Sequence, residues 1–416
     1  MEYGCIGEKL GHSFSKEIHN SLANYEYLLK ELKREELSEF FKKKDFKAIN
    51  VTIPYKQDVI PYLDWISDEA KSINAVNTIV NKNGKLYGYN TDFYGLKALI
   101  ERANVSLKAK KVAILGSGGT SNTAFAVANF LDAHSVLKVS RNKKDGYITY
   151  DELYENYSDC EIIINTTPCG MYPQIGVSAV NLEKLPKVEA VFDAVYNPLK
   201  SKLILDAKAR NITATGGLYM LVSQAAFAVE KFIETPVDNN KVEDIFKNLY
   251  KQKMNIALIG MPASGKTSVG KVLSGKINKS FVDSDDEIVK TENKSISEIF
   301  ENSGEAYFRT IEKNIIKELS MLNSQVISTG GGAVLNSENI ENLKGNSRIY
   351  FLDRPLDMLI TTSDRPLSSN RADLEKRLNE RYELYKSSAD VIIDGSKSVV
   401  EVAKLIEEDF YEYSCN

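Results

Sequence analysis

Residues 254–269 read M-N-I-A-L-I-G-M-P-A-S-G-K-T-S-V, an apolar run that leads directly into Gly260-x4-Gly265-Lys266-Thr267. The run is too short for a comfortable helix and a helical pattern follows it, which is the strand, loop and helix context of a P-loop. In a P-loop, backbone N–H groups face the phosphates of a nucleotide, Lys266 reaches the terminal phosphates and the Thr267 hydroxyl contacts Mg²⁺. The alternative is a chance glycine-rich turn, which the spacing and the flanks disfavour. A domain therefore starts near Met254, and roughly 250 residues precede it.

The composition bounds the organisation of the chain and excludes several classes of function. Its 416 residues predict two or three domains. Lys plus Arg number 53 and Asp plus Glu 57, so the net charge of −4 gives no electrostatic reason to expect nucleic acid or an anionic membrane as a partner. No apolar run has membrane-spanning length, the N-terminus lacks a signal-like pattern, and the cysteines and histidines form no metal-binding spacing. We therefore expect a soluble, cytoplasmic protein.

Polar loops interrupt the first hundred residues at places where apolar runs end. The loop over residues 11–16 contains two serines and precedes a helix predicted over residues 17–30. These hydroxyls could hold an oxygen-rich small molecule, with Ser15 as a simple N-cap as the alternative. A strand-like stretch, residues 48–53, ends at a loop that presents Lys56, for which a surface position is the alternative. Asp92 stands one residue before the predicted start of a later helix at Phe93.

A second glycine-rich turn follows the strand-like residues 111–115. It reads G-S-G-G and opens a small-residue helix, which is a variant of the Rossmann dinucleotide turn. The next predicted strand ends in Arg141, followed by Lys143 and Lys144. An acidic residue there would pair with the ribose of NAD, whereas Arg141 suits the 2′-phosphate of NADP, with a solvated basic turn as the alternative. Alternating strands and helices to residue 232 predict a parallel sheet covered on both faces.

Two ordered sets of motifs resemble known families. Residues 1 to about 252 resemble shikimate dehydrogenase, through G-H-S-F-S, N-V-T-I-P-Y-K, A-V-N-T, Y-N-T-D, G-S-G-G, V-Y-N-P and L-V-S-Q-A. Residues 254 to about 410 resemble shikimate kinase, through the P-loop, F-V-D-S-D, G-E-A-Y-F-R, S-T-G-G-G-A-V, R-P-L and N-E-R-Y-E-L-Y. The resemblance implies a bifunctional enzyme of chorismate and aromatic amino acid biosynthesis, which reduces 3-dehydroshikimate to shikimate with NADPH and phosphorylates shikimate to shikimate 3-phosphate with ATP and Mg²⁺.

In the dehydrogenase half, the resemblance implies that Lys56 and Asp92 are the catalytic pair, which orients the substrate and donates a proton to the alkoxide formed by hydride transfer. The residues it implies for substrate binding are Ser13, Ser15, Thr52, Asn77, Tyr196 and Gln224. Those it implies for NADP binding are Gly116, Gly118, Gly119, Arg141, Gly217 and Met220. Residues 140–144 depart from the family's usual Asn-Arg-Thr, and the crossover 145–150 is too short for the usual helix, which bears on the cofactor preference.

In the kinase half, the resemblance implies three catalytic residues: Asp285, which orients or deprotonates the 3-hydroxyl, Lys266, and Arg365 in the lid segment. The metal residues are Thr267 and Asp283. Asp283 and Asp285 are two residues apart at a predicted strand end and should share one face, with a solvated acidic turn as the alternative. The ATP-binding residues are Gly260, Ser264, Gly265, Lys266, Thr267 and Ser268. The substrate-binding residues are Arg309, Gly331, Gly332 and Arg381.

The expected fold is α/β throughout. We expect an N-terminal α/β substrate domain over residues 1–100, a Rossmann NADP-binding domain over 101–235, a helix over 236–252 that returns to the substrate domain, and a P-loop kinase-type domain with a parallel sheet over 253–416. The expected partners are small-molecule substrates, and the chain is a monomer or a homodimer. Two alternative functions stay open: a quinate/shikimate dehydrogenase that prefers NAD, and a metabolite-sensing protein with an inactive half.

Overall fold

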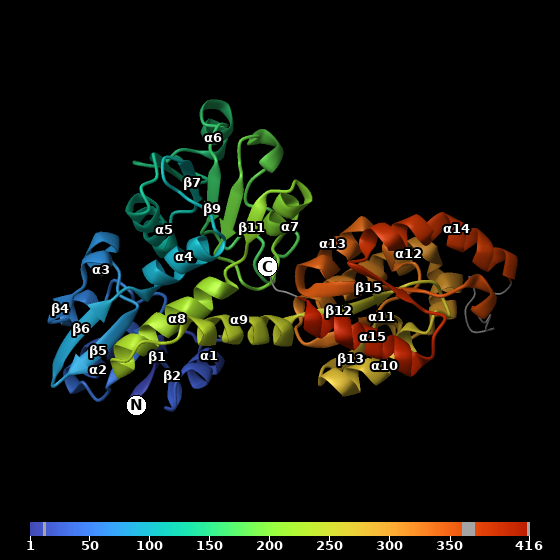
Figure 1. Cartoon of the computed structure of the whole chain (residues 1–416), viewed down its shortest axis with the longest axis horizontal. Helices are drawn as coiled ribbons and strands as arrows, with labels where there is room; N and C mark the ends of the chain where they lie inside the picture. Colours follow the sequence, from blue (N-terminus) through green and yellow to red (C-terminus); the bar gives the residue numbers. More distant parts are fainter. Residues whose placement is uncertain (11–13, 360–370, 414–416) are drawn as a thin grey trace. The chain divides into compact units, whose positions relative to one another are not determined.

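The computed structural model describes residues 1–10, 14–359 and 371–413 of the chain. The chain divides into two compact units. Unit 1 comprises Met1–Cys169, Ser178–Tyr196 and Asp206–Asn248, and unit 2 comprises Gly170–Val177, Asn197–Leu205 and Leu249–Asn416. In the described part of the chain, unit 1 holds two sheets and unit 2 holds one (Figure 1). None of the described helices is long and apolar enough to cross a membrane.

The first sheet of unit 1 has mixed strand directions and the order β2-β1-β3-β5-β6-β4. Its strands are β1 (Tyr3–Gly7), β2 (Tyr27–Glu31), β3 (Ala48–Val51), β4 (Trp65–Ile66), β5 (Thr78–Lys82) and β6 (Lys85–Tyr89). Its helices are α1 (Ser15–Leu22), η1 (Arg34–Glu36), α2 (Leu37–Lys43), η2 (Ile60–Tyr62) and α3 (Asp68–Ile73). The strands β1, β2 and β3 run parallel, whereas β5 runs antiparallel to both β3 and β6.

The helix predicted over residues 17–30 is wrong in its second half. The helix ends at Leu22, and Tyr27–Glu31 instead forms β2, which pairs with β1 in parallel register. The reason is tertiary: Tyr27 is 1% exposed and its hydroxyl donates a hydrogen bond to Asn50 Oδ1 at 2.7 Å. Pairing with β1, which precedes this segment in the sequence, outweighs the local helical pattern.

The second sheet of unit 1 is parallel throughout, in the order β11-β10-β9-β7-β8. Its strands are β7 (Lys111–Leu115), β8 (Ser135–Val139), β9 (Ile162–Asn165), β10 (Ala190–Asp193) and β11 (Thr213–Thr215). The helices between β6 and the sheet of unit 2 are α4 (Thr91–Arg102), α5 (Gly119–Phe130), α6 (Tyr150–Asn156), η3 (Leu182–Lys184), α7 (Lys202–Ala209), α8 (Leu218–Ile233) and α9 (Asn239–Lys253). Helices α4 and α8 pack side by side, and α8 also contacts α1, β3 and β5, so α8 ties the two sheets together (Figure 1).

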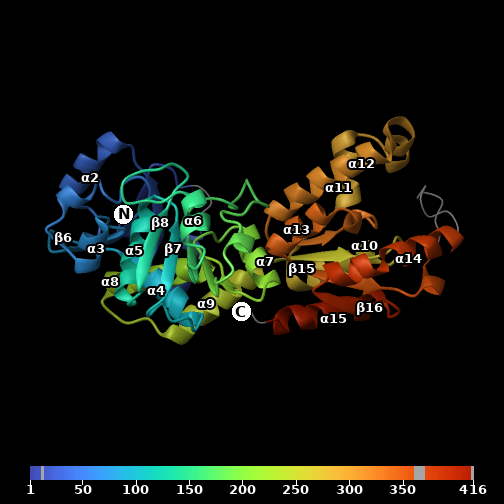
Figure 2. The same cartoon turned by 90° about the horizontal axis from the view of Figure 1, so that it is seen from above.

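The sheet of unit 2 is also parallel throughout, in the order β13-β14-β12-β15-β16. Its strands are β12 (Asn255–Ile259), β13 (Ser280–Asp283), β14 (Gln325–Ser328), β15 (Ser347–Asp353) and β16 (Val391–Asp394). Its helices are α10 (Lys266–Ile277), α11 (Ser284–Glu292), α12 (Ile296–Met321), η4 (Ala333–Leu335), α13 (Ser337–Asn346), η5 (Leu356–Met358), α14 (Arg371–Ser388) and α15 (Val399–Glu412). Figure 2 shows α13 and α15 on opposite sides of β15, so this sheet is covered on both faces. The predicted α/β fold, with its substrate, Rossmann and P-loop parts, is confirmed.

A buried histidine lies in the core of unit 1. His19 is 1% exposed, its ring stacks on Tyr27 with centroids 3.9 Å apart, and its Nδ1 shares a hydrogen bond of 2.8 Å with the Tyr25 hydroxyl. Burial lowers the pKa of His19 from 6.5 to about 3. Below pH 6.5 an unfolded chain therefore binds a proton that the folded chain does not bind, and unit 1 loses stability as the pH falls.

We expect His19→Phe to reduce this acid sensitivity. A single proton difference changes the free energy of unfolding by about 1.4 kcal/mol per pH unit, or about 2 kcal/mol between pH 6.5 and 5. The variant should lack this loss. Above pH 6.5, the free energy of unfolding should change with pH in the same way in the variant and in wild type. Urea unfolding followed by the fluorescence of Trp65, the single tryptophan of the chain, measures unit 1 selectively. Equal losses of stability in both proteins between pH 6.5 and 5 would contradict the prediction.

Candidate active sites

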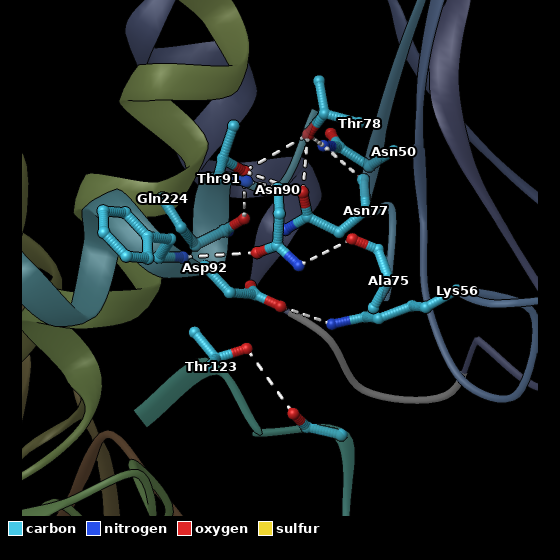
Figure 3. Close-up of polar contacts among 12 residues, drawn as sticks. Asn50, Lys56, Ala75, Asn77, Thr78, Asn90, Thr91, Asp92, Thr123 and Gln224 are labelled. Carbon is cyan, nitrogen blue, oxygen red and sulfur yellow. Dashed lines mark hydrogen bonds and ion pairs between the residues drawn. The ribbon is translucent and has the colours of Figure 1, made fainter. Parts of the chain in front are cut away.

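Lys56 and Asp92 meet in unit 1. Lys56 follows β3, and its backbone carbonyl accepts a hydrogen bond from the Val76 N–H at 2.8 Å. Asp92 lies in the first turn of α4, whose N-cap Asn90 accepts from the Phe93 N–H. The Lys56 ammonium donates to Asp92 Oδ2 at 2.5 Å, and the two side chains are 26% and 17% exposed (Figure 3). The pair is therefore held by two separate backbone anchors and stays accessible to a small molecule.

A hydrogen-bond network beside this pair fixes the orientation of Asn77. Its Oδ1 accepts from the Thr91 N–H at 2.7 Å and from the Thr78 hydroxyl at 3.0 Å (Figure 3). The Thr78 oxygen in turn accepts from Asn50 Nδ2 at 3.0 Å. Because the carbonyl oxygen of the amide is occupied, the Asn77 amide group is left to act as a donor toward an oxygen of a ligand. Sequence reasoning missed Asn50, Thr78 and Thr91, although all three stand within the quoted motifs.

Gln224 reaches the same place from α8. Its Oε1 lies 3.5 Å from the Thr91 hydroxyl, and its Nε2 donates to the Leu221 carbonyl of its own helix at 3.0 Å. The approach of α8 to α4 depends on Gly95, where a Cβ would lie 2.7 Å from the Met220 carbonyl oxygen and 2.8 Å from Gln224 Cβ. Met220 itself is buried in the core around the second sheet. Gly95 was not predicted, and only the packing of the two helices shows its role.

Three further predicted substrate residues of unit 1 stand at or just beyond the ends of helices and strands. Ser15 is the first residue of α1, but the N-cap is Phe14 and no side-chain hydrogen bond caps the helix, so the N-cap interpretation of Ser15 is wrong. The Thr52 N–H donates to the Ile6 carbonyl at 3.0 Å, which fixes this residue beside the end of β1. Tyr196 lies three residues beyond the end of β10. Ser13 lies outside the described residues.

The glycine turn after β7 leaves room for a phosphate group. Gly116 has φ +112° and lies so close to Thr166 that a Cβ would be 2.7 Å from its Oγ1. At Gly118 and Gly119, by contrast, an added Cβ would meet nothing within 4 Å, and these two residues open α5. The open backbone at a helix N-terminus fits the pyrophosphate of a dinucleotide. At Gly217, a Cβ would lie 2.3 Å from the Ala194 carbonyl oxygen, so this position excludes any side chain.

Basic side chains follow β8, next to this turn. Arg141 lies two residues beyond the end of the strand. Lys143 is engaged by Glu152, with its Nζ 2.6 and 2.8 Å from the two carboxylate oxygens, whereas the Lys144 ammonium lies 3.9 Å from the centre of the Tyr147 ring. Residues 145–149 contain no helix, but α6 begins at Tyr150, so the connection between β8 and β9 does include a helix. Arg141 is thus the cation of this turn that best fits a 2′-phosphate.

The P-loop of unit 2 forms the strand, loop and helix predicted for it. Gly260 and Gly265 adopt φ of +148° and +92°, and Gly265 is the N-cap of α10. The Lys266 ammonium donates to the carbonyls of Gly260 and Met261 at 2.9 and 2.8 Å. Ser264 Oγ is buried and has no hydrogen-bond partner among the described residues, while an added Cβ at Gly265 would meet nothing within 4 Å. A loop with open backbone and an unused hydroxyl fits the phosphates of ATP.

A hydroxyl and a carboxylate next to the P-loop fit a hard cation. The Thr267 hydroxyl donates to Asp283 Oδ2 at 2.7 Å, and Ser328 Oγ lies 3.5 Å from Thr267 Oγ1. Mg²⁺ prefers oxygen ligands of this kind, and phosphate oxygens and water would complete its coordination shell. Asp283 also caps α11, because its Oδ1 accepts from the Asp285 N–H at 3.0 Å. The expectation that both aspartates share one strand face is therefore wrong: Asp283 ends β13, and Asp285 stands in the first turn of the following helix.

Arg309 and Arg381 converge on the glycines that follow β14. Arg381 Nη1 and the Tyr385 hydroxyl donate to the Gly331 carbonyl at 3.1 and 2.5 Å. Arg309 Nη1 donates to Glu312 Oε2 at 2.8 Å, and Glu312 is 1% exposed. Burial raises the pKa of the Glu312 carboxyl, while the Arg309 guanidinium acts in the opposite direction. Sequence reasoning missed Glu312 and Tyr385, although both lie within one helical turn of a predicted arginine.

The last predicted kinase residues are a serine and an arginine. Ser268 is exposed on α10, next to the Thr267 that faces Asp283. Arg365 lies outside the described residues.

We expect Gly332→Ala to weaken shikimate binding selectively. An added Cβ would lie 2.3 Å from Arg309 Nη1 and must displace the guanidinium. Loss of a charge-assisted contact to the substrate carboxylate should raise KM for shikimate about tenfold, while KM for ATP stays within about twofold. Steady-state phosphorylation assays measure both values. Gly275→Ala is the matched control, because a Cβ on this α10 residue meets nothing within 4 Å. Unchanged KM for shikimate in Gly332→Ala would remove Arg309 from the substrate site.

Comparisons with known proteins match both units. A model of the shikimate dehydrogenase substrate binding domain matches residues 5–79, and a shikimate kinase model matches residues 262–410. A shikimate dehydrogenase (NADP(+)) of Clostridium perfringens is 39% identical over 264 residues, which are 59% of this chain and 97% of that protein. The solved shikimate dehydrogenase 1 from Peptoclostridium difficile is 34% identical, with a TM-score of 0.55 over 60% of this chain and 98% of that one. A chorismate mutase/shikimate 5-dehydrogenase fusion protein from Clostridium acetobutylicum is 35% identical, with a TM-score of 0.56 over 59% and 96%.

Proposed function

We propose that this chain, which belongs to the shikimate dehydrogenase family and carries a shikimate kinase domain, reduces 3-dehydroshikimate to shikimate and then phosphorylates the 3-hydroxyl of that shikimate. It is a bifunctional enzyme of the shikimate pathway, with NADP, ATP and Mg²⁺ as cofactors. The observation that supports this order is the contact between the Lys56 ammonium and Asp92, which suits protonation of the oxygen that the second reaction then phosphorylates. One product is the other substrate.

In the reduction, Lys56 is the proton donor. NADPH, when bound, supplies the hydride. The developing negative charge on the C3 oxygen of the substrate receives a proton from the Lys56 ammonium, and Asp92 holds that ammonium in place through its 2.5 Å contact. Asn77 donates to a ring hydroxyl because its own carbonyl oxygen is occupied. Ser13 and Ser15 hold the carboxylate, Thr52 and Gln224 hold the remaining ring oxygens, and Tyr196 is a further substrate contact.

In the phosphorylation, positioning and charge neutralisation do most of the work. ATP supplies the phosphoryl group and Mg²⁺ neutralises its charge when both are bound at the P-loop. Lys266, which now contacts two backbone carbonyls, would instead bind the phosphates, and Thr267 with Asp283 would hold the metal ion. Asp285 accepts the proton of the 3-hydroxyl. Arg309 and Arg381 bind the shikimate carboxylate beside Gly331 and Gly332. A catalytic role for Arg365, which lies outside the described residues, is part of the proposal.

We retain the predicted domain boundaries as part of this proposal. The substrate domain spans residues 1–100, the Rossmann domain 101–235, the returning helix 236–252 and the kinase domain 253–416. Each of the three sheets falls within one of these ranges, which supports them. The partners are small molecules of the shikimate type, and the place of action is the cytoplasm.

A single incubation tests the proposal. Purified protein is supplied with 3-dehydroshikimate, NADPH, ATP and Mg²⁺, and the products are identified by mass. We expect shikimate 3-phosphate, and shikimate alone when ATP is omitted. Accumulation of shikimate in the complete mixture would refute the kinase assignment, and no product despite nucleotide binding would indicate a sensing protein. Faster reduction with NADH than with NADPH would favour the NAD-preferring quinate/shikimate dehydrogenase.

A further inference from the structure

An aromatic contact links the two sheets of unit 1 at the edge of the dehydrogenase site. The rings of Phe14 and Tyr196 have centroids 5.5 Å apart and planes inclined at 58°. Phe14 precedes α1, which packs beside the first sheet, whereas Tyr196 follows β10 of the second sheet. Tilted aromatic pairs at this separation contribute stabilising free energy in addition to that of the apolar area that they bury. The contact therefore joins the loop of the substrate-binding serines to the loop of a predicted substrate-binding tyrosine.

The backbones on both sides of this contact are anchored. The Phe14 carbonyl accepts from the Ile18 N–H at 3.0 Å and so begins the helical hydrogen bonds of α1. Next to Tyr196, the Val195 N–H donates to Asp193 Oδ1 at 3.0 Å and the Val195 carbonyl accepts from the Gly217 N–H at 2.9 Å. With both backbones fixed, the direction of the Tyr196 ring depends on what packs against it. Among the described residues, Phe14 is the aromatic side chain that does so.

The hydroxyl of Tyr196 is available to a ligand. The described residues give this hydroxyl no hydrogen-bond partner, although burial of the ring raises its pKa above the ordinary value. The hydroxyl is not fully buried, so in place of water it can donate a hydrogen bond to an oxygen of a ligand. The neighbouring Ser15, on the other side of Phe14 from Ser13, is a predicted ligand of the substrate carboxylate.

We propose that Phe14 is a positioning residue of the dehydrogenase: its ring holds the Tyr196 ring so that the tyrosine hydroxyl meets the substrate. The inference rests on the proposed role of Tyr196 in substrate binding. Phe14 itself makes no polar contact with the substrate, and its whole effect passes through the hydroxyl of Tyr196.

The test is a cycle of variants assayed in the reduction of 3-dehydroshikimate. We expect Phe14→Ala and Tyr196→Phe each to raise KM for 3-dehydroshikimate about tenfold and to leave KM for NADPH within about twofold. Phe14→Tyr keeps the ring and should stay within about threefold of wild type. In a Tyr196→Phe background, Phe14→Ala should cost less than about twofold, because the hydroxyl that it positions is already absent.

Three results would overturn the inference: wild-type kinetics in Phe14→Ala, a full Phe14→Ala effect in the Tyr196→Phe background, or wild-type kinetics in Tyr196→Phe. Wild-type kinetics in Tyr196→Phe would also remove Tyr196 from the substrate site, but none of the three results would touch the two proposed reactions, which stand or fall with product formation by the wild-type chain. Phosphorylation of shikimate by the same preparations gives the concentration of intact protein. Trp65 fluorescence reports the folding of unit 1, and Phe14→Leu replaces Phe14→Ala if the alanine variant does not fold.

Discussion

Lys56→Met should lower kcat for the reduction of 3-dehydroshikimate by about 10²–10⁴-fold. Methionine matches the lysine side chain as far as the ε atom but removes both the proton donor and the 2.5 Å contact with Asp92. The substrate would still bind through residues on other loops, so we expect KM to change far less than kcat. The kinase reaction of the same chain should stay at its wild-type rate, because its residues lie in the other unit.

Lys97→Met is the matched control for this variant. Lys97 also pairs with a carboxylate, Glu101 at 2.5 Å, and its side chain is 27% exposed, against 26% for Lys56. It lies on α4, the same helix as Asp92, but the proposed chemistry gives it no task. The control should reduce 3-dehydroshikimate within about twofold of wild type. If Lys56→Met kept its rate within about tenfold, the assignment of Lys56 as proton donor would be wrong.

The second large effect belongs to Asp285→Asn, for which we expect a loss of about 10²–10⁴-fold in kcat for shikimate phosphorylation. The amide cannot accept the proton of the attacking hydroxyl. The backbone N–H of residue 285 still donates to Asp283 Oδ1, so the cap of α11 and the Thr267–Asp283 contact remain. ATP affinity, measured by calorimetry or by nucleotide displacement, should therefore stay within about threefold of wild type.

The neighbouring Asp286→Asn makes the same chemical change on an exposed side chain of the same helix turn. It should phosphorylate shikimate at nearly the wild-type rate. Such a result would show that the loss in Asp285→Asn comes from that carboxylate and not from the removal of one negative charge in this helix turn. An unaffected rate in Asp285→Asn would contradict the assigned base. Equal losses in both variants would point to the net charge at the helix N-terminus instead.

Local patterns were sufficient for the elements that follow short-range rules. The P-loop and the G-S-G-G turn were predicted in place because each depends on a few consecutive residues whose backbone freedom is readable from glycine, and both are confirmed by β12 with α10 and by β7 with α5. The helix predicted over residues 17–30 failed because β2 exists only through its pairing with β1. No periodicity within that segment carries such information.

In the sites too, motifs identify residues, whereas tertiary structure decides which of them are in contact. Lys56 and Asp92 were identified from motifs, but their contact depends on anchors at Val76 and Asn90 that the sequence does not connect. Glu312 was missed because a buried glutamate on a helix looks like any surface glutamate until its neighbours are known. At Gly330, an added Cβ would lie 2.6 Å from Asp285 Oδ1 and 3.0 Å from Glu312 Oε1, a meeting of three segments that only the folded chain produces.

By itself, the sequence determined the α/β class, the two families, the nucleotide-binding turns and the identity of most proposed site residues, because each of these is encoded in consecutive residues or in their order along the chain. Tertiary structure alone decided which side chains meet: the amide orientation of Asn77, the position of Asp285 on a helix, and the packing of Phe14 on Tyr196. The physical reason is that hydrogen bonds and ring contacts depend on distances of a few ångströms between segments far apart in the chain, which spacing along the sequence does not specify.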